Sequence, residues 1–138
     1  MPQMIFVNLP VKDLERSKDF FGKLGYFSNP QFTDETTACV VISETIFVML
    51  LTEERFRQFT KKEIADPATS TGVILALSAE SRQKVDELAD AALAAGGSPA
   101  NDPMDYGTMY GRSFQDPDGH IWEVMWMDPA VVEGGQNG

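Results

Sequence analysis

The run FQDPDGHIWEVMWMDP, residues 114–129, places a single carboxylate, Glu123, among large apolar residues. A carboxylate in such a position can coordinate a divalent metal, act as a general base, or form an ion pair inside the protein. An ionised carboxylate with apolar neighbours on both faces of a strand costs several kcal/mol unless it is paired or hydrogen-bonded. We therefore expect Glu123 to have a partner.

The residues DPDG within this run are turn formers and predict a β-hairpin. If Pro117 and Asp118 form the centre of the loop, Arg112 lies directly opposite Glu123, with Cβ atoms about 5 Å apart. This register predicts an Arg112–Glu123 ion pair, which could also orient a polar ligand. A one-residue bulge in the hairpin would place Ser113 opposite Glu123 instead.

Two other residue types that could act as a nucleophile or a metal ligand occur once each, as Cys39 and His120. Cys39 lies in an apolar, strand-like run, so we expect a small buried thiol rather than a nucleophile, which needs an electropositive setting. A single cysteine excludes an intramolecular disulfide and fits a reducing compartment. Strand alternation places His120 on the opposite face from Glu123, so we expect a turn histidine rather than a metal ligand.

The composition narrows the classes of partner. The chain of 138 residues has a net charge of −10, and its eleven Lys and Arg residues are scattered, so nucleic-acid binding is not expected. No run of eighteen apolar residues predicts a membrane span, and the first residues lack the features of a secretory signal, so we expect a cytoplasmic protein. The acidity favours solubility, or the attraction of cationic ligands.

Hydrophobic periodicity predicts the same series of elements twice, a strand, a helix and three strands. The expected elements of the first half are strand 4–11, helix 13–25, a short strand at 26–29 and strands 38–42 and 46–51. Those of the second half are strand 73–79, helix 81–95 and the hairpin arms 109–115 and 120–127. We therefore expect a first module at 1–51, a helical connector at 52–71, a second module at 72–128 and a disordered tail at 129–138.

This repeat, together with the segments FVNLPVKDLERSKDFFGKLGY and SFQDPDGHIWEVMWM, resembles the vicinal oxygen chelate superfamily. The superfamily includes glyoxalase I, the bleomycin-resistance proteins and the extradiol dioxygenases. The resemblance covers residues 4–128 and implies an α+β fold, in which two βαβββ modules in tandem form curved mixed sheets around a cleft. It also implies a homodimer, because many members are dimeric.

Enzymes of this superfamily usually hold a divalent metal with four strand residues. By the resemblance, these positions fall on Phe6, on Val48 or Met49, on Val73 and on Glu123. Of these only Glu123 has the usual ligand chemistry, since a tight site for Zn²⁺, Ni²⁺ or Fe²⁺ needs three or four N, O or S donors. We therefore expect no metal cofactor.

Strand alternation and the resemblance together predict a ligand-binding cleft face rich in aromatic and methionine side chains, as is typical of a small-molecule pocket. Its predicted members are Phe6, Asn8, Met49, Val73, Tyr110, Arg112, Glu123 and Met125. The competing hypothesis is that these side chains only fill the space between the modules.

Three functions remain open at this point. The first is metal-independent binding of a small aromatic or cationic molecule, as in the bleomycin-resistance proteins. The second is a lyase, isomerase or dioxygenase with a rearranged metal site, in which Glu123 is the base or the metal anchor. The third is a non-catalytic scaffold without a small ligand.

Overall fold

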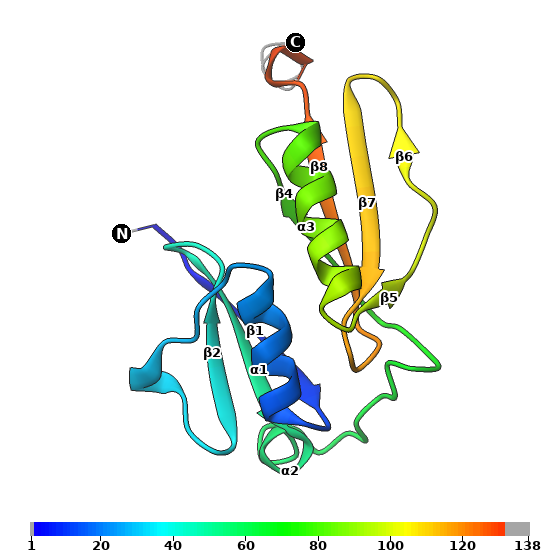
Figure 1. Cartoon of the computed structure of the whole chain (residues 1–138). Helices are drawn as coiled ribbons and strands as arrows, with labels where there is room; N and C mark the ends of the chain where they lie inside the picture. Colours follow the sequence, from blue (N-terminus) through cyan, green and yellow to red (C-terminus); the bar gives the residue numbers. More distant parts are fainter. Residues whose placement is uncertain (1, 132–138) are drawn as a thin grey trace. The chain divides into compact units, whose positions relative to one another are not determined.

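The computed structural model describes residues 2–131, and the chain divides into two compact units at the boundary between Ser70 and Thr71 (Figure 1). Each unit has its own sheet and its own long helix. Most of the predicted tail, residues 132–138, lies outside the described residues. Within the described part of the chain, no helix is long and apolar enough to cross a bilayer.

The first unit contains a three-stranded sheet in the order β1-β3-β2. Strand β1 pairs with β3 in parallel, and β2 pairs with β3 in antiparallel orientation. The short strand expected at 26–29 is reduced to a single bridge between Ser28 and Val40. The elements are β1 (Ile5–Val11), α1 (Leu14–Lys23), the 3₁₀ helix η1 (Pro30–Phe32), β2 (Thr37–Val41), β3 (Ile46–Thr52) and α2 (Glu53–Phe56).

The second unit repeats this arrangement with a longer sheet, in the order β4-β8-β7-β5, and β6 also pairs with β7. Strands β4 and β8 are parallel, and β7 and β8 form the antiparallel hairpin. The elements are β4 (Ile74–Ser78), α3 (Arg82–Ala94), β5 (Ser98–Pro99), β6 (Met104–Asp105), β7 (Met109–Gln115) and β8 (Ile121–Met127). The predicted α+β fold of two βαβββ modules is confirmed.

Each long helix begins at a side-chain cap. Asp13 accepts a hydrogen bond from the Arg16 N–H at 3.1 Å, and Ser81 accepts one from the Lys84 N–H at 3.1 Å. Both caps satisfy a backbone donor that the first helical turn leaves without a partner. Gly25 follows α1 with a φ of 101°, as the left-handed end of a helix requires.

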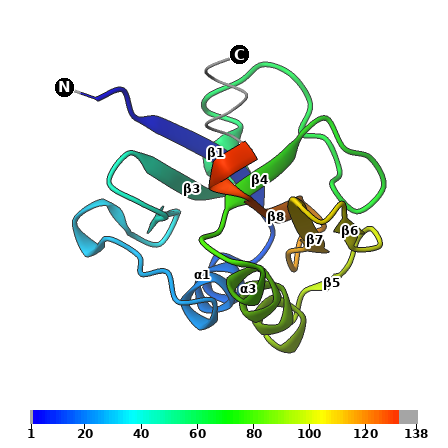
Figure 2. The ribbon, with the colours of Figure 1, turned by 90° about the horizontal axis from the view of Figure 1, so that it is seen from above.

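In each unit the helix covers one face of the sheet, which contains the buried core (Figures 1 and 2). In the second unit Val85 and Ala89 of α3 pack against Val124 of β8, and all three are fully buried. In the first unit Leu9 of β1 and Leu50 of β3 lie side by side and are almost completely buried. The other face of each sheet is therefore the one left for a ligand.

The connector is less helical than expected. Only Glu53–Phe56 forms an α-helix. Thr52 caps its N-terminus by accepting a hydrogen bond from the Arg55 N–H. Phe59, which lies beyond this short helix, is 64% exposed. Without tertiary packing, a segment of this length is too short to remain helical, because helix nucleation is costly.

Candidate ligand-binding site

The helix caps align the two modules and identify equivalent positions in them. Phe6 lies seven residues before the cap Asp13, and Ile74 lies seven residues before the cap Ser81. The expectation that Val73 occupies the position equivalent to Phe6 is therefore corrected to Ile74. Val73 also precedes β4, and by alternation its place belongs to the face of Leu75, which faces the helix side of the sheet.

Strand pairing extends the equivalence to the last strand of each module. Phe6 is aligned with Phe47 in β3, and Ile74 is aligned with Ile121 in β8. Two residues further along these strands are Met49 and Glu123, so Met49 rather than Val48 is the equivalent of Glu123. Val48 is buried on the helix side of its sheet.

Three predicted ligand-binding residues share the open face of the first sheet. Phe6 and Asn8 alternate on β1, and Asn8 is aligned with Met49 on β3. The Phe6 ring stacks on Phe47, with ring centroids 4.9 Å apart and an interplanar angle of 12°. Because Phe6 is 52% exposed, this face presents an accessible aromatic surface.

Cys39 lies opposite Met49 on the neighbouring strand β2 and is buried, as expected. Burial raises the pKa of the Cys39 thiol, which disfavours the reactive thiolate. Cys39 is therefore part of the packing beneath this face.

The DPDG turn is organised by Asp116, a carboxylate that is only 4% exposed. Its Oδ1 accepts the backbone N–H groups of Asp118, Gly119 and His120 at 3.0–3.1 Å. Its Oδ2 accepts the Trp122 indole N–H at 3.0 Å. Burial raises the pKa of Asp116, and the charge of His120 and these N–H donors oppose that rise. Asp116 thus fixes the geometry from which β8 starts.

The turn sets a register that differs by one residue from the predicted one. The Asp116 N–H donates to the His120 carbonyl, and Gly119 has a φ of 102°. A three-residue loop that ends in a left-handed glycine adds one residue to the connection. As a result Arg112 is aligned with Val124, and Ser113 is aligned with Glu123. The predicted Arg112–Glu123 pair is wrong, and the bulged alternative describes the hairpin.

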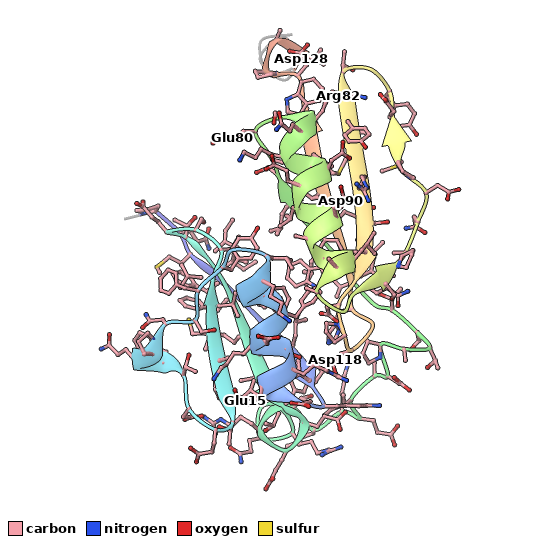
Figure 3. All side chains as sticks on the ribbon, viewed as in Figure 1. Glu15, Glu80, Arg82, Asp90, Asp118 and Asp128 are labelled. Atoms are coloured by element: carbon pink, nitrogen blue, oxygen red, sulfur yellow. The ribbon has the colours of Figure 1, made fainter. Side chains whose placement is uncertain are left out.

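Arg112 is instead bound by α3. Its Nη1 lies 3.1 Å from Asp86 Oδ1 and 2.8 Å from Asp90 Oδ1 (Figure 3 shows Asp90 on this helix). Tyr110, two residues earlier on the same face, donates its hydroxyl to Asp86 Oδ1 at 2.6 Å. That hydrogen bond is the main cause of a lowered pKa of Asp86, and Arg112 adds to it. The side chains of Tyr110 and Arg112 are therefore bonded on the helix side of the sheet, contrary to the prediction that they share a face with Glu123.

Arg82 completes the polar layer between α3 and the sheet. Its guanidinium lies 4.4 Å from the centroid of the Tyr110 ring and 5.9 Å from that of Trp126. Arg82 also forms an ion pair with Asp105 of β6, which lowers the pKa of that carboxyl. Arg82 and Arg112 therefore form their ion pairs on the helix side of the sheet. Glu123 lies on the opposite face and pairs with neither of them.

Glu123 and Met125 lie beside a cavity of about 140 Å³ on the open face of the second sheet. Glu123 is flanked by Ala76 on β4 and Ser113 on β7, and neither is a cation. Within residues 2–131, no donor or cation is bonded to its carboxylate. The lining consists of Asn101, Asp102, Met104, Gly111, Arg112, Ser113, Glu123 and Met125.

Sequence reasoning missed several of these lining residues. Gly111 was missed, and Ser113 was reached only through the bulged alternative, because the one-residue register error exchanged the two faces of β7. Met104 belongs to β6, a two-residue strand that is too short to show alternation. The glycine within an otherwise regular strand pattern was the available signal, since such a glycine often marks a close approach to the backbone.

A second hollow, of about 400 Å³, lies in the first unit around the end of α1. Its charged side chains already pair with each other, Lys18 with Glu15 and Lys23 with Asp19. The Tyr26 phenol also lines it, and burial raises the pKa of Tyr26. Self-paired charges make this hollow a weaker ligand site than the cavity beside Glu123.

The four positions that hold a metal in related enzymes have a donor set that does not fit one. By the resemblance and the equivalence of the two modules, these positions fall on Phe6, Met49, Ile74 and Glu123, of which only Glu123 offers a hard donor. Among the described residues, no group of three or more His, Cys, Asp or Glu side chains is placed to hold a metal ion. No catalytic step through such a metal follows from these residues.

Comparison with known proteins gives a family match over part of the chain and matches of the fold over most of it. Residues 3–43 match the family described as bleomycin resistance protein-like N-terminal. No curated protein sequence matches the chain significantly.

Solved structures match over most of the chain. A hypothetical protein from S. aureus is 26% identical, with a TM-score of 0.76 over 91% of this chain and 94% of its own. A glyoxalase/bleomycin resistance protein/dioxygenase family enzyme from Burkholderia phytofirmans is 15% identical, with a TM-score of 0.74 over 91% of this chain and 99% of its own. An antibiotic-binding protein from a Streptomyces species is 16% identical, with a TM-score of 0.65 over 92% and 97%.

The chain therefore has the glyoxalase/bleomycin-resistance fold. The partial family match and the shared fold agree with the resemblance to the vicinal oxygen chelate superfamily that the two sequence segments indicate.

Proposed function

We propose that this protein binds a small aromatic or cationic molecule, without a metal, on the open faces of its two sheets. The observation that carries this proposal is the character of those faces. The first presents the stacked Phe6–Phe47 pair and Met49, and the second presents Met125 and the carboxylate of Glu123 beside a cavity. Apolar walls with a few placed polar groups are typical of small-molecule sites.

The donor chemistry supports binding rather than metal-assisted catalysis. Three of the four positions that would hold a metal carry Phe6, Met49 and Ile74, whose side chains offer at most a thioether. A carboxylate without metal companions remains suited to an organic cation. The net charge of −10 adds a long-range attraction for cations.

The comparison with the protein from Streptomyces supports the same class of function, because that protein has the same fold and is an antibiotic-binding protein. By the resemblance to the superfamily, we also propose that the protein is a homodimer. Its placement in the cytoplasm remains part of this proposal.

Titration of the purified protein with a panel of aromatic and cationic compounds, including acridine dyes and basic glycopeptides, tests this function. We expect saturable binding by calorimetry, unchanged after the protein has been treated with a chelator. If no compound of the panel binds saturably, the proposal is contradicted and a non-catalytic scaffold is favoured.

The alternative of a lyase, isomerase or dioxygenase with Glu123 as metal anchor makes the opposite prediction. It requires close to one equivalent of Ni²⁺, Zn²⁺ or Fe²⁺ in protein purified without chelators, and activity that depends on that metal. Elemental analysis separates the two functions, because the proposed one predicts less than about a tenth of an equivalent of bound metal.

A further inference from the structure

The cavity beside Glu123 contains a glycine that its backbone does not require. Gly111 lies in the middle of β7, and its φ is outside the left-handed region in which glycine is needed. A glycine inside a strand weakens it, so an interior glycine often marks close approach of another group. The reason for glycine at this position must therefore lie in the space above it.

That space lies between two methionines. Gly111 is aligned with Met104 on β6 and with Met125 on β8, so the two side chains flank a position that has none. A Cβ added at Gly111 would lie 3.3 Å from Met125 Cγ and 3.8 Å from Met125 Cε. The missing side chain therefore makes room for Met125, which lies close over the β7 backbone. Met104 and Met125 wall the remaining slot beside Glu123 with thioethers, and thioether sulfurs make favourable contacts with aromatic rings.

The slot has the size of a single flat group. A cavity of about 150 Å³ accommodates a benzene-sized ring, and this one measures about 140 Å³. A ring or a planar amidinium of that size therefore fits between the methionine walls without a larger opening.

The polar groups of the cavity select for positive charge. Glu123 and Asp102 both line it, and the carboxylate of Glu123 has no bonded cation within residues 2–131. Arg112 also lines the cavity, but its guanidinium is bound by Asp86 and Asp90 of α3. The Ser113 hydroxyl is occupied too, since it accepts the Asn101 N–H at 2.8 Å and donates to the Asn101 carbonyl at 3.2 Å.

We propose that this cavity is a subsite for a flat organic cation, which lies against Met104 and Met125 and pairs its charge with Glu123. The inference rests on the proposed function and narrows it to one class of ligand group, a protonated amidine, guanidine or aromatic amine. A planar N–H donor pair also matches the two oxygens of a carboxylate.

Benzamidinium and benzamide test the subsite, because they share shape and differ in charge. We expect benzamidinium to bind the wild-type protein about tenfold more tightly than benzamide, the difference expected for one added ion pair in a partly enclosed site. In spectra of methyl-labelled methionine, the ring should shift the Met104 and Met125 signals.

Two variants with matched controls assign the effect to named residues. Glu123→Gln should bring the two affinities to within about twofold, while Glu87→Gln, the same charge change on α3, should keep the tenfold preference. Gly111→Ala should weaken both probes about fivefold or more, because the added methyl group pushes the Met125 side chain toward the slot. Gly72→Ala, where a Cβ meets no atom within 4 Å, should weaken neither. Thermal unfolding of each variant verifies that it is folded.

Equal affinity of the wild-type protein for both probes, a preference that survives Glu123→Gln, or shifts confined to other methionines would each overturn the subsite. If those results appear while larger aromatic compounds still bind saturably, the subsite is wrong and the proposed function stands. If neither the two probes nor any compound of the wider panel binds, both proposals are wrong.

Discussion

Replacement of Asp116 by Asn tests the turn that places Glu123. An amide has one oxygen, so Asp116→Asn can keep the three backbone N–H bonds to Oδ1 only by turning its NH₂ group toward the Trp122 indole N–H. A lost hydrogen bond to a charged acceptor costs about 1.5–3 kcal/mol. Removal of a buried charge offsets part of this cost, because burial already raises the pKa of Asp116. We expect a net loss of about 2 kcal/mol in the free energy of unfolding.

Urea unfolding followed by circular dichroism measures this loss, with Glu80→Gln as the matched control. Glu80 is exposed, so its substitution should change stability by less than about 0.5 kcal/mol. Trp122→Phe removes the other partner of the same bond, so the double variant should cost about 1–2 kcal/mol less than the sum of the single ones. A loss below about 0.5 kcal/mol for Asp116→Asn, or full additivity in the double variant, would refute the proposed role of Asp116.

Three further predictions concern α3 and its contacts. Arg112→Met should show a coupling of about 0.5–1 kcal/mol with Asp86→Asn and almost none with Glu123→Gln in double-mutant cycles, and coupling only to Glu123 would contradict the observed register. The lowered pKa of Asp86 means that its contribution to stability is present above its unfolded pKa of about 4 and is lost as the pH falls through the folded value. Tyr110→Phe removes the main cause of that lowering, so acid titration of stability should show a smaller loss below about pH 4; an unchanged loss would count against it. Ser81→Ala removes the cap of α3 and should cost about 1 kcal/mol in thermal unfolding, whereas no change would show that the cap is dispensable.

Local patterns in the sequence predict the elements of this fold well. Strand β7 begins and ends at the predicted residues, Met109 and Gln115, because its arm alternates and the DPDG turn follows directly. The caps Asp13 and Ser81 were identifiable for the same reason, since each serine or aspartate precedes an apolar helical stripe. Cys39 was correctly expected to be buried, because apolar residues surround it in the chain.

The candidate site was harder to predict, because its geometry depends on one residue of register. The left-handed Gly119 lengthens the turn by one residue, and this places Gly111 and Ser113, rather than Arg112, on the face of Glu123. The partners of Arg112 come from α3, more than twenty residues earlier, where no local pattern indicates an ion pair. Strand pairing and tertiary contacts therefore decide which face each charge occupies.

Met104 illustrates the second limit of sequence reasoning. It lies in a two-residue strand after an irregular segment, so neither periodicity nor turn signals identify it as a wall of the cavity. Ile74 illustrates a third limit, since the position of the second module's first strand becomes certain only when the cap of α3 is used as the reference. Both residues become visible only through their strand partners.

The most direct test of the account is a fluorescence titration with proflavine, a planar cationic dye, in the presence of a chelator. Saturable binding by the wild-type protein should be unchanged by removal of metal and should be weakened about tenfold by Glu123→Gln. Binding that appears only when Ni²⁺, Zn²⁺ or Fe²⁺ is added, or that is unaffected by Glu123→Gln, would contradict it.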